Sequence, residues 1–342
     1  MPGPLKLGSA LIAAILFLLG ILNCATLRGG IEYDRALQAY QDHQYRVAES
    51  LLRSTLRQNP GEERAISLLG WVYFKQGRVE EAGKLFTEAD RINPENIVTI
   101  EGLGWIGYTL DQNEKAEENF KKLLRFGEKH FWNPDWTYYD RNDREIIQSI
   151  YSEGSFGLGL IAKRRGRWKE ARDHLERAFT HPNRFIDHDT IAKELADILF
   201  QLGEYKQAAV IYKDSISRNP LNTLLLNRYA WCLFQSGNHE EAKQIFLRSK
   251  ELSSVPEEFR HDLFGSQSVT QRLRGKRIAE PYYGLALIYI KEGRLDAAQE
   301  ELASALKISP YFHHPHEVSL LLAQYPEWRE RLRRKSLGRS LP

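Results

Sequence analysis

The chain has 342 residues, of which 42% are hydrophobic and 27% are charged, and this composition is that of a folded protein rather than a disordered one. Its net charge of +3 excludes a strong basic field of the kind that draws proteins onto nucleic acid, so no nucleic-acid partner is expected. The two cysteines, Cys24 and Cys232, are too few for a disulfide framework or a cysteine-based zinc site.

The N-terminal segment is apolar. Residues 7–27 follow Lys6 without a charged side chain, and 21 residues at about 1.5 Å each are long enough to cross a hydrocarbon core of roughly 30 Å. We therefore expect residues 1–28 to form a signal anchor or transmembrane segment. A lipoprotein signal is the alternative, because Ile21-Leu22-Asn23-Cys24 resembles a bacterial lipobox with Cys24 as the lipidated residue, although Asn23 stands where a small residue is usual.

The charges around this segment point in two directions. Arg28, Arg35 and Arg46 follow it closely, which by the positive-inside rule argues against export of the following chain. A short charged leader before a long apolar run is, however, how an export signal begins. We expect a membrane-anchored protein whose remaining residues lie on the periplasmic or extracytoplasmic side, with the cytoplasmic-facing orientation as the alternative.

A 34-residue pattern recurs through the rest of the chain. Its clearest copy, residues 68–94, predicts a helix, a turn at Gly77, a second helix and a closing proline. The turn position is held in successive copies by His43, Gly77, Asp111, Gly166, Gly203, Gly237 and Gly293. The second helix carries a small residue, Ala48, Ala82, Ala116, Ala171, Ala208, Ala242 or Ala298, and four positions later a large one, Leu52, Phe86, Phe120, Leu175, Tyr212, Phe246 or Leu302. Small residues let two helices approach closely, and the large ones fill the space between neighbouring pairs.

This pattern resembles the L-G-x2-Y…A-x3-F…P signature of the tetratricopeptide repeat (TPR) family, in about seven copies over residues 29–312. The resemblance implies an all-α fold, a TPR α-solenoid in which antiparallel helix pairs stack into a right-handed superhelix. Insertions near residues 131–151 and 257–278 break the period, and such insertions map to one face of a solenoid, often the binding face. Residues 313–342 are expected to form a C-terminal capping helix and a basic tail.

In the TPR family the first helix of each pair lines the concave face. The residue after the Leu-Gly pair and the residue three positions later share that face. These positions hold Trp71, Phe74, Trp105, Tyr108, Phe200, Trp231 and Phe234, and Asp197 stands before Phe200. The resemblance therefore implies an aromatic partner-binding groove. Packing of the tryptophans beneath a cap or an insertion explains the same pattern equally well.

The first insertion is also rich in aromatic residues. Trp132, Trp136, Tyr138 and Tyr139 stand around the turn signal Asn133-Pro134-Asp135, and they are predicted to form a secondary contact loop or a loop folded back on its neighbours. Some TPR proteins clamp a partner's C-terminal carboxylate with an asparagine on the concave face. Tryptophan occupies that position here in three copies, which argues against such a clamp.

No sequence motif points to catalysis. The chain has no nucleophile elbow, no phosphate-binding glycine loop and no HExxH, so no catalytic residue, cofactor or metal is expected. The run His313-His314-Pro315-His316 is a weak metal signal, because Pro315 breaks helical spacing. Cys232 follows Trp231 on an inner helix and is expected to be a small core residue.

The expected function is a non-enzymatic protein-protein interaction scaffold, tethered to the membrane and holding an extended or helical segment of a protein partner in the aromatic groove. Resemblance to envelope-localised TPR proteins implies a process such as cell-envelope assembly, secretion or polysaccharide export. Two alternatives stay open. The first is a polysaccharide-binding protein whose sugar rings stack on tryptophan, and the second is an accessory module of an enzyme complex.

Overall fold

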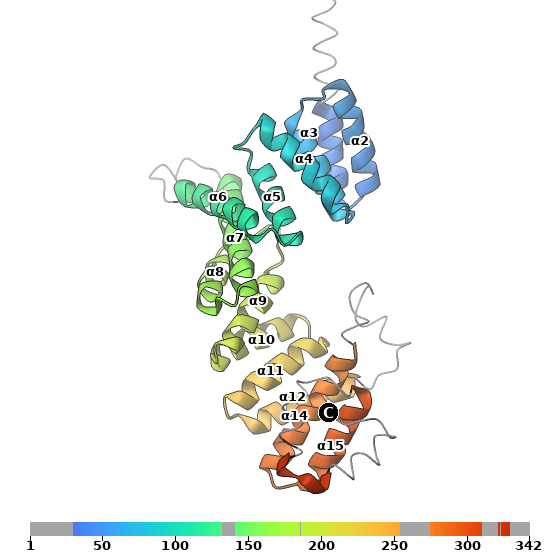
Figure 1. Cartoon of the computed structure of the whole chain (residues 1–342), viewed down its shortest axis with the longest axis vertical. Coiled ribbons are helices and arrows are strands. Elements are labelled where there is room, and N and C mark those ends of the chain that lie inside the picture. Colours follow the sequence, from blue (N-terminus) through green and yellow to red (C-terminus); the bar gives the residue numbers. More distant parts are fainter. Residues whose placement is uncertain are drawn as a thin grey trace, which may run out of the picture. The chain divides into compact units, whose positions relative to one another are not determined.

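The structure is a computed structural model that describes residues 30–131, 141–184, 186–253, 274–309, 321 and 323–328. Every regular element in these ranges is an α-helix (Figure 1). The chain divides into two units, unit 1 (Met1–Ile186) and unit 2 (Asp187–Pro342). Each unit is a stack of antiparallel helix pairs, which confirms the predicted all-α TPR solenoid.

Both units follow the predicted helix-turn-helix order. Unit 1 contains a helix over residues 30–41 and then α2 (Tyr45–Gln58), α3 (Glu63–Lys75), α4 (Val79–Ile92), α5 (Ile97–Thr109), α6 (Asn113–Phe131), α7 (Arg141–Arg164) and α8 (Trp168–Thr180). Unit 2 contains α9 (His188–Gln201), α10 (Tyr205–Arg218), α11 (Thr223–Gln235), α12 (His239–Ser253), α14 (Arg274–Lys291) and α15 (Leu295–Ile308). In unit 1, α5 packs against α3 on one side and α7 on the other, so the first helices of successive pairs lie side by side.

The turn inside each pair has a left-handed residue at the predicted position. Gly77, Gly166, Gly203, Gly237 and Gly293 all have a positive φ, between 71° and 86°, which glycine adopts without a steric cost. His43 and Asp111 hold the same position in their copies with φ at 59°. The conformation closes each first helix; in the second copy the amide of Arg78 donates to the carbonyl of Tyr73 at 2.9 Å.

Glycines on the first helices receive the large aromatic side chain of the second helices. A Cβ at Gly70 of α3 would lie 2.9 Å from the Phe86 ring, and a Cβ at Gly102 of α5 would lie 2.4 Å from it. Phe120 lies in the same way between Gly104 and Gly157, and Phe246 packs on Gly284 in unit 2. Because each of these glycines has no side chain, the ring can occupy the space beside its backbone. They form what we call glycine sockets, and the sockets set how closely successive pairs stack.

The first insertion is partly helical. The structure extends α6 to Phe131 and begins α7 at Arg141, so residues 141–151, which the periodicity assigns to the insertion, form the first turns of a 24-residue helix. Ile150 in these turns joins a buried cluster with Leu123 and Leu124 of α6, which explains why the helix continues. The predicted contact-loop residues Trp132, Trp136, Tyr138 and Tyr139 lie outside the described residues.

Several other sequence predictions also lie outside the described residues. They are the N-terminal anchor of residues 1–28 with Cys24, the second insertion except for residues 274–278, the histidine run and most of the C-terminal region. Among the helices that the structure does describe, none combines the length and the apolar character needed to cross a membrane.

Candidate functional site

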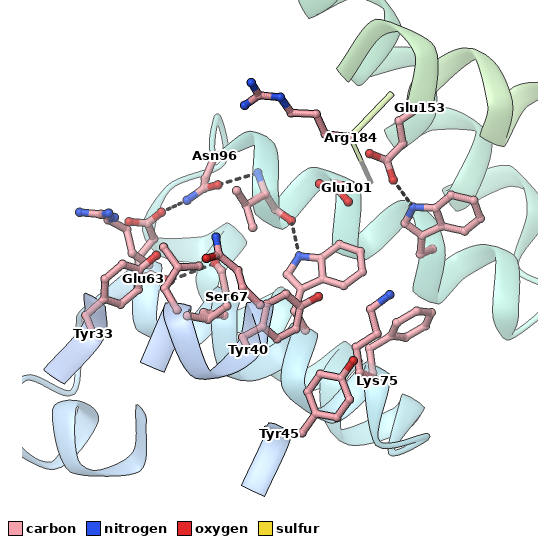
Figure 2. A pocket seen from close by; sticks show the side chains of 18 of the residues that line it. Tyr33, Tyr40, Tyr45, Glu63, Ser67, Lys75, Asn96, Glu101, Glu153 and Arg184 are labelled. Atoms are coloured by element: carbon pink, nitrogen blue, oxygen red, sulfur yellow. Dashed lines mark hydrogen bonds between the residues drawn. The ribbon is translucent and has the colours of Figure 1, made fainter. Parts of the chain in front are cut away.

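Unit 1 contains a groove with a volume of about 900 Å³, formed by the helix over residues 30–41 together with α3, α5 and α7 (Figure 2). We call it the unit 1 groove. Six aromatic side chains line it: Tyr33, Tyr40, Tyr45, Trp71, Phe74 and Trp105. Charged groups contribute as well, and they include Glu101, Glu153 and Lys75. The first helices of four successive pairs therefore supply one concave surface.

Three of the seven predicted groove residues, Trp71, Phe74 and Trp105, line the unit 1 groove. Tyr108 lies one turn further along α5 and is covered by the Arg164 guanidinium, 3.8 Å from the ring centre. The other three belong to unit 2. There Trp231 and Phe234 meet edge to face at 5.6 Å, and Phe200 packs on Tyr205 at 5.2 Å.

Most of each buried tryptophan serves packing. Trp71 and Trp231 are each only 7% exposed. The Trp71 ring meets Phe74 and Phe86 edge to face, at 5.6 and 5.5 Å between ring centres, and its Nε1 donates to the carbonyl oxygen of Val98 at 3.3 Å. Packing is thus a sufficient reason for tryptophan at this position, and only the remaining edge of the indole faces the groove.

Trp105 and Trp231 take part in the same arrangement, once in each unit. Trp105 Nε1 donates to Glu153 Oε1 at 2.7 Å, and Trp231 Nε1 donates to Glu280 Oε1 at 2.9 Å. The two tryptophans are 126 positions apart and the two glutamates 127. Each ring also contacts an equivalent aromatic residue of the same glutamate-bearing helix, Phe156 at 6.2 Å or Tyr283 at 6.1 Å.

Sequence reasoning missed these tryptophan-glutamate pairs, although a signal was present. Each glutamate stands five positions before the leucine that opens the next copy, Leu158 or Leu285, and each such copy follows an insertion. A comparison of the two halves aligns the tryptophans at an offset of 126 residues and the glutamates at an offset of 127.

Two carboxyl groups meet at the floor of the unit 1 groove. Glu153 is only 2% exposed, and it forms a side-chain hydrogen bond with the partly buried Glu101. Burial raises the pKa of both groups, and for Glu101 the neighbouring charge of Glu153 raises the pKa further. The positive charge of Lys75, an exposed side chain, lowers the pKa of both carboxyls. The pair therefore holds a shared proton more firmly than ordinary glutamates do.

The phenol of Tyr40 faces the same pair from the helix over residues 30–41. Burial raises the pKa of Tyr40 above its usual value, and the charges of Glu101, Tyr45 and Glu153 add to that effect. Tyr40 thus stays a neutral hydrogen-bonding group among the side chains that line the groove (Figure 2).

The corresponding region of unit 2 carries internal cations. Asp197 Oδ1 accepts from the Tyr212 hydroxyl at 2.5 Å and lies 3.7 Å from Arg228 Nε, and Asp197 Oδ2 accepts from Lys193 Nζ at 3.0 Å. Although burial alone would lower the pKa of Arg228, the charges of Asp197 and Glu280 raise it. The acids on this wall of unit 2 therefore face positive charges of the same chain.

Cys232 is fully buried beside Trp231, as expected for a small core residue. Burial raises the pKa of its thiol to about 12, which keeps it protonated and a poor nucleophile. In the part of the chain that the structure describes, no three histidine, cysteine or acidic side chains are placed to hold a metal ion.

Family models agree with the repeat pattern. Four models described as "Tetratricopeptide repeat" match residues 33–97, 154–177, 199–252 and 279–312, together a little over half of the chain. Among curated proteins, "Tetratricopeptide repeat protein 21A" of Mus musculus is 28% identical over 131 residues, or 38% of this chain and 9% of that protein. "Anaphase-promoting complex subunit 3" of Schizosaccharomyces pombe is 31% identical over 101 residues, or 29% of this chain and 15% of that protein. The chain thus matches only a small part of either relative.

Solved structures share the fold. "Pseudomonas Aeruginosa pilF" superposes with a TM-score of 0.53 at 17% identity, covering 70% of this chain and 99% of that one. "PilW, widely conserved type IV pilus biogenesis factor" gives a TM-score of 0.52 at 19% identity, covering 69% and 98%. With the repeat positions, the helix pairs, the glycine sockets and the family matches in agreement, the chain is a member of the tetratricopeptide repeat family.

Proposed function

We propose that this TPR protein is a non-enzymatic interaction scaffold that holds an extended or helical segment of a protein partner in the unit 1 groove. The observation that carries the proposal is the groove itself, about 900 Å³ of concave surface with six aromatic side chains on its walls. Aromatic anchors surrounded by polar groups are typical of surfaces that bind peptide segments.

The polar side chains at the rim of the groove are held in place by neighbouring residues. Asn96 caps α5 and accepts from the amide of Val98 at 2.8 Å, and its side-chain nitrogen donates to Glu63. Arg64 lies 4.6 Å above the Tyr33 ring. Because these side chains are already fixed by neighbours, a bound segment would lose little further freedom in ordering them.

We further propose that residues 1–28 tether the scaffold to a membrane, with the repeats on the extracytoplasmic side. The support is the uncharged run of residues 7–27. One of the proteins with a similar fold is described as a type IV pilus biogenesis factor, and by analogy we propose a role in assembling cell-envelope machinery. Palmitate labelling of the parent and of Cys24→Ser separates a lipid anchor from a transmembrane one.

A site-specific photo-crosslinker tests the groove. Placed at Phe74, inside the groove, it should label a discrete partner in cells, whereas the same group at the exposed Ile92 on α4 should not. The labelled segment is then synthesised, and its affinity for the purified full chain is measured. We expect Phe74→Ala to weaken binding about tenfold or more and Ile92→Ala to leave it unchanged.

Equal labelling at both positions, or binding that Phe74→Ala does not weaken, contradicts the groove proposal. The polysaccharide hypothesis is tested by affinity gels loaded with polysaccharide. It is favoured if the gels retard the parent but not Phe74→Ala and if the cross-linker labels no protein. In both cases the melting temperature of each variant is measured first, so that a folding defect is not mistaken for a binding defect.

A further inference from the structure

The two units provide an internal comparison for the floor of the unit 1 groove. Trp105 and Glu153 in unit 1 correspond to Trp231 and Glu280 in unit 2, with nearly equal hydrogen-bond lengths of 2.7 and 2.9 Å. The surroundings of the two glutamates can therefore be compared position by position, at the offset of 126 residues that relates α5 to α11.

The comparison reveals opposite charge arrangements. In unit 2, Arg228 supplies a positive charge to Glu280 and Asp197. The position 126 residues earlier is Gly102, which has no side chain to supply one. The preceding residue of α11 is Asn227, and its counterpart in α5 is Glu101. Unit 1 thus has an additional acid where unit 2 has an amide, and a glycine where unit 2 has an arginine.

Packing prevents the chain from placing a cation at that position in unit 1. Gly102 is a socket for Phe86, and even a Cβ there would lie 2.4 Å from the ring. Glu101, which is partly buried, and Glu153, which is 2% exposed, instead line the groove (Figure 2). The space beside them is accessible to a group that comes from another molecule.

The other charged groups around the pair offset its negative charge only in part. Lys75 of α3 lowers the pKa of both carboxyls, but its side chain is exposed and its Nζ lies 5.9 Å from the centre of the Trp71 ring. Arg184, which follows α8, is held by Glu145 at 2.5 Å. Trp105 from α5 contributes a neutral donor, and Tyr40 from the helix over residues 30–41 is a neutral phenol whose pKa burial and the two carboxyls raise. The two carboxyls therefore carry one negative charge while they share a proton and two after that proton is lost.

We propose that the unit 1 groove recognises a basic side chain of its partner, a lysine or an arginine, whose cation binds between Glu101 and Glu153 with its aliphatic stem along Trp71 and Trp105. This inference rests on the proposed groove function and specifies the chemistry of its anchor. Aromatic side chains beside a pair of acids suit such a residue, because the carboxylates attract its cation and the apolar rings pack along its aliphatic stem. The cation takes the place that Arg228 occupies in unit 2.

Binding of a cation displaces the proton that the two carboxyls share. Below the pKa of the pair, each unit of pH therefore changes the affinity by up to about tenfold, with stronger binding at higher pH. This linkage is a signature that aromatic stacking alone would not produce.

The test uses the full chain in detergent, with 5-fluorotryptophan reporting on Trp105 by ¹⁹F NMR. The probes are N-acetyl-arginine amide, N-acetyl-lysine amide and, as a neutral match for the arginine probe, N-acetyl-citrulline amide. We expect the Trp105 signal to shift with a basic probe and not with citrulline. Glu153→Gln and Glu101→Gln should each weaken the response about tenfold or more, whereas the matched change in unit 2, Glu280→Gln, should not.

An equal response to citrulline, no response to either basic probe, or a response that survives both groove variants would overturn the inference. The two groove variants also distinguish a failure of the basic-anchor inference from a failure of the proposed groove function. If the segment cross-linked at Phe74 binds Glu101→Gln and Glu153→Gln as tightly as the parent, the groove function stands and the basic anchor does not. If no segment is cross-linked, the groove function itself fails.

Discussion

Phe86 of α4 lies so close to Gly102 of α5 that a Cβ at position 102 would be 2.4 Å from its ring. We expect Gly102→Ala to destabilise unit 1 by about 1–3 kcal/mol, the range that an overpacked core costs. Urea denaturation followed by circular dichroism measures the loss. Gly61→Ala is the matched control, because nothing lies within 4 Å of a Cβ there. A Gly102→Ala protein as stable as this control would show that the ring moves aside freely.

The turn positions predict a change in the opposite direction. His43 has φ at 59°, in the region where a residue with a side chain is strained and glycine is not. His43→Gly removes that strain but also gives the unfolded chain more freedom, so we expect a gain of at most about 0.5 kcal/mol. At the equivalent Gly77, whose φ is 80°, alanine introduces strain and should cost about 1–2 kcal/mol. Thermal unfolding of the two variants should therefore give shifts of opposite sign.

The carboxyl pair predicts a dependence of stability on pH. The pKa of Glu101 in the folded chain is raised well above its ordinary value of 4.5, so the folded state binds the proton more tightly than the unfolded state. The contribution of this group to stability is then greatest at low pH and falls as the pH rises from the ordinary value through the raised one. Glu101→Gln removes the titration. The variant should gain stability relative to the parent as the pH rises from about 5 to about 8.

Melting temperatures of parent and variant across that range measure this difference. Glu280→Gln is the control, because it neutralises the glutamate of unit 2 that corresponds to Glu153, the partner of Glu101. A stability difference between Glu101→Gln and the parent that is constant with pH would mean that the two carboxyls titrate independently as ordinary glutamates.

The tryptophan-glutamate hydrogen bonds predict an order of effects among three indole substitutions. Trp105→Phe removes the indole donor of the nearly fully buried Glu153, and we expect a loss of about 1–3 kcal/mol beyond the lost packing. Trp231→Phe should cost a similar amount, since its bond to Glu280 has almost the same length. Trp71→Phe should cost less, because its acceptor is the Val98 carbonyl at 3.3 Å. Chemical denaturation ranks the three variants, and a largest loss at Trp71 would contradict the order.

The repeat itself could be predicted because its determinants are local. Gly77, Ala82 and Phe86 lie within one helix pair, and the structure places them at the turn, the close contact and the buried ring that the spacing predicts. The role of Gly102 was not predicted, because the ring that requires glycine there belongs to the preceding pair, and a single copy of the motif does not show it.

The floor of the groove was less accessible to sequence reasoning. Glu101 and Glu153 are separated by 52 positions that include the first insertion, and only the packing of α5 against α7 brings them together. The sequence shows that tryptophan recurs at one position of the repeat. That recurrence could not show that Trp71 is only 7% exposed and packs edge to face on Phe86. Periodicity identifies which face of a helix a residue shares, whereas burial depends on the neighbour against which that face packs.

The closest packing in unit 1 joins helices that are adjacent or next but one along the chain. Chains with such short-range contacts can fold in the order in which they leave the ribosome, because no strand or helix from a distant part of the sequence is needed. The described residues that line the unit 1 groove all lie before Asp187, so they are synthesised before unit 2. At ordinary elongation rates the rest of the chain takes on the order of ten seconds to follow, time enough for a partner to dock on a nascent protein.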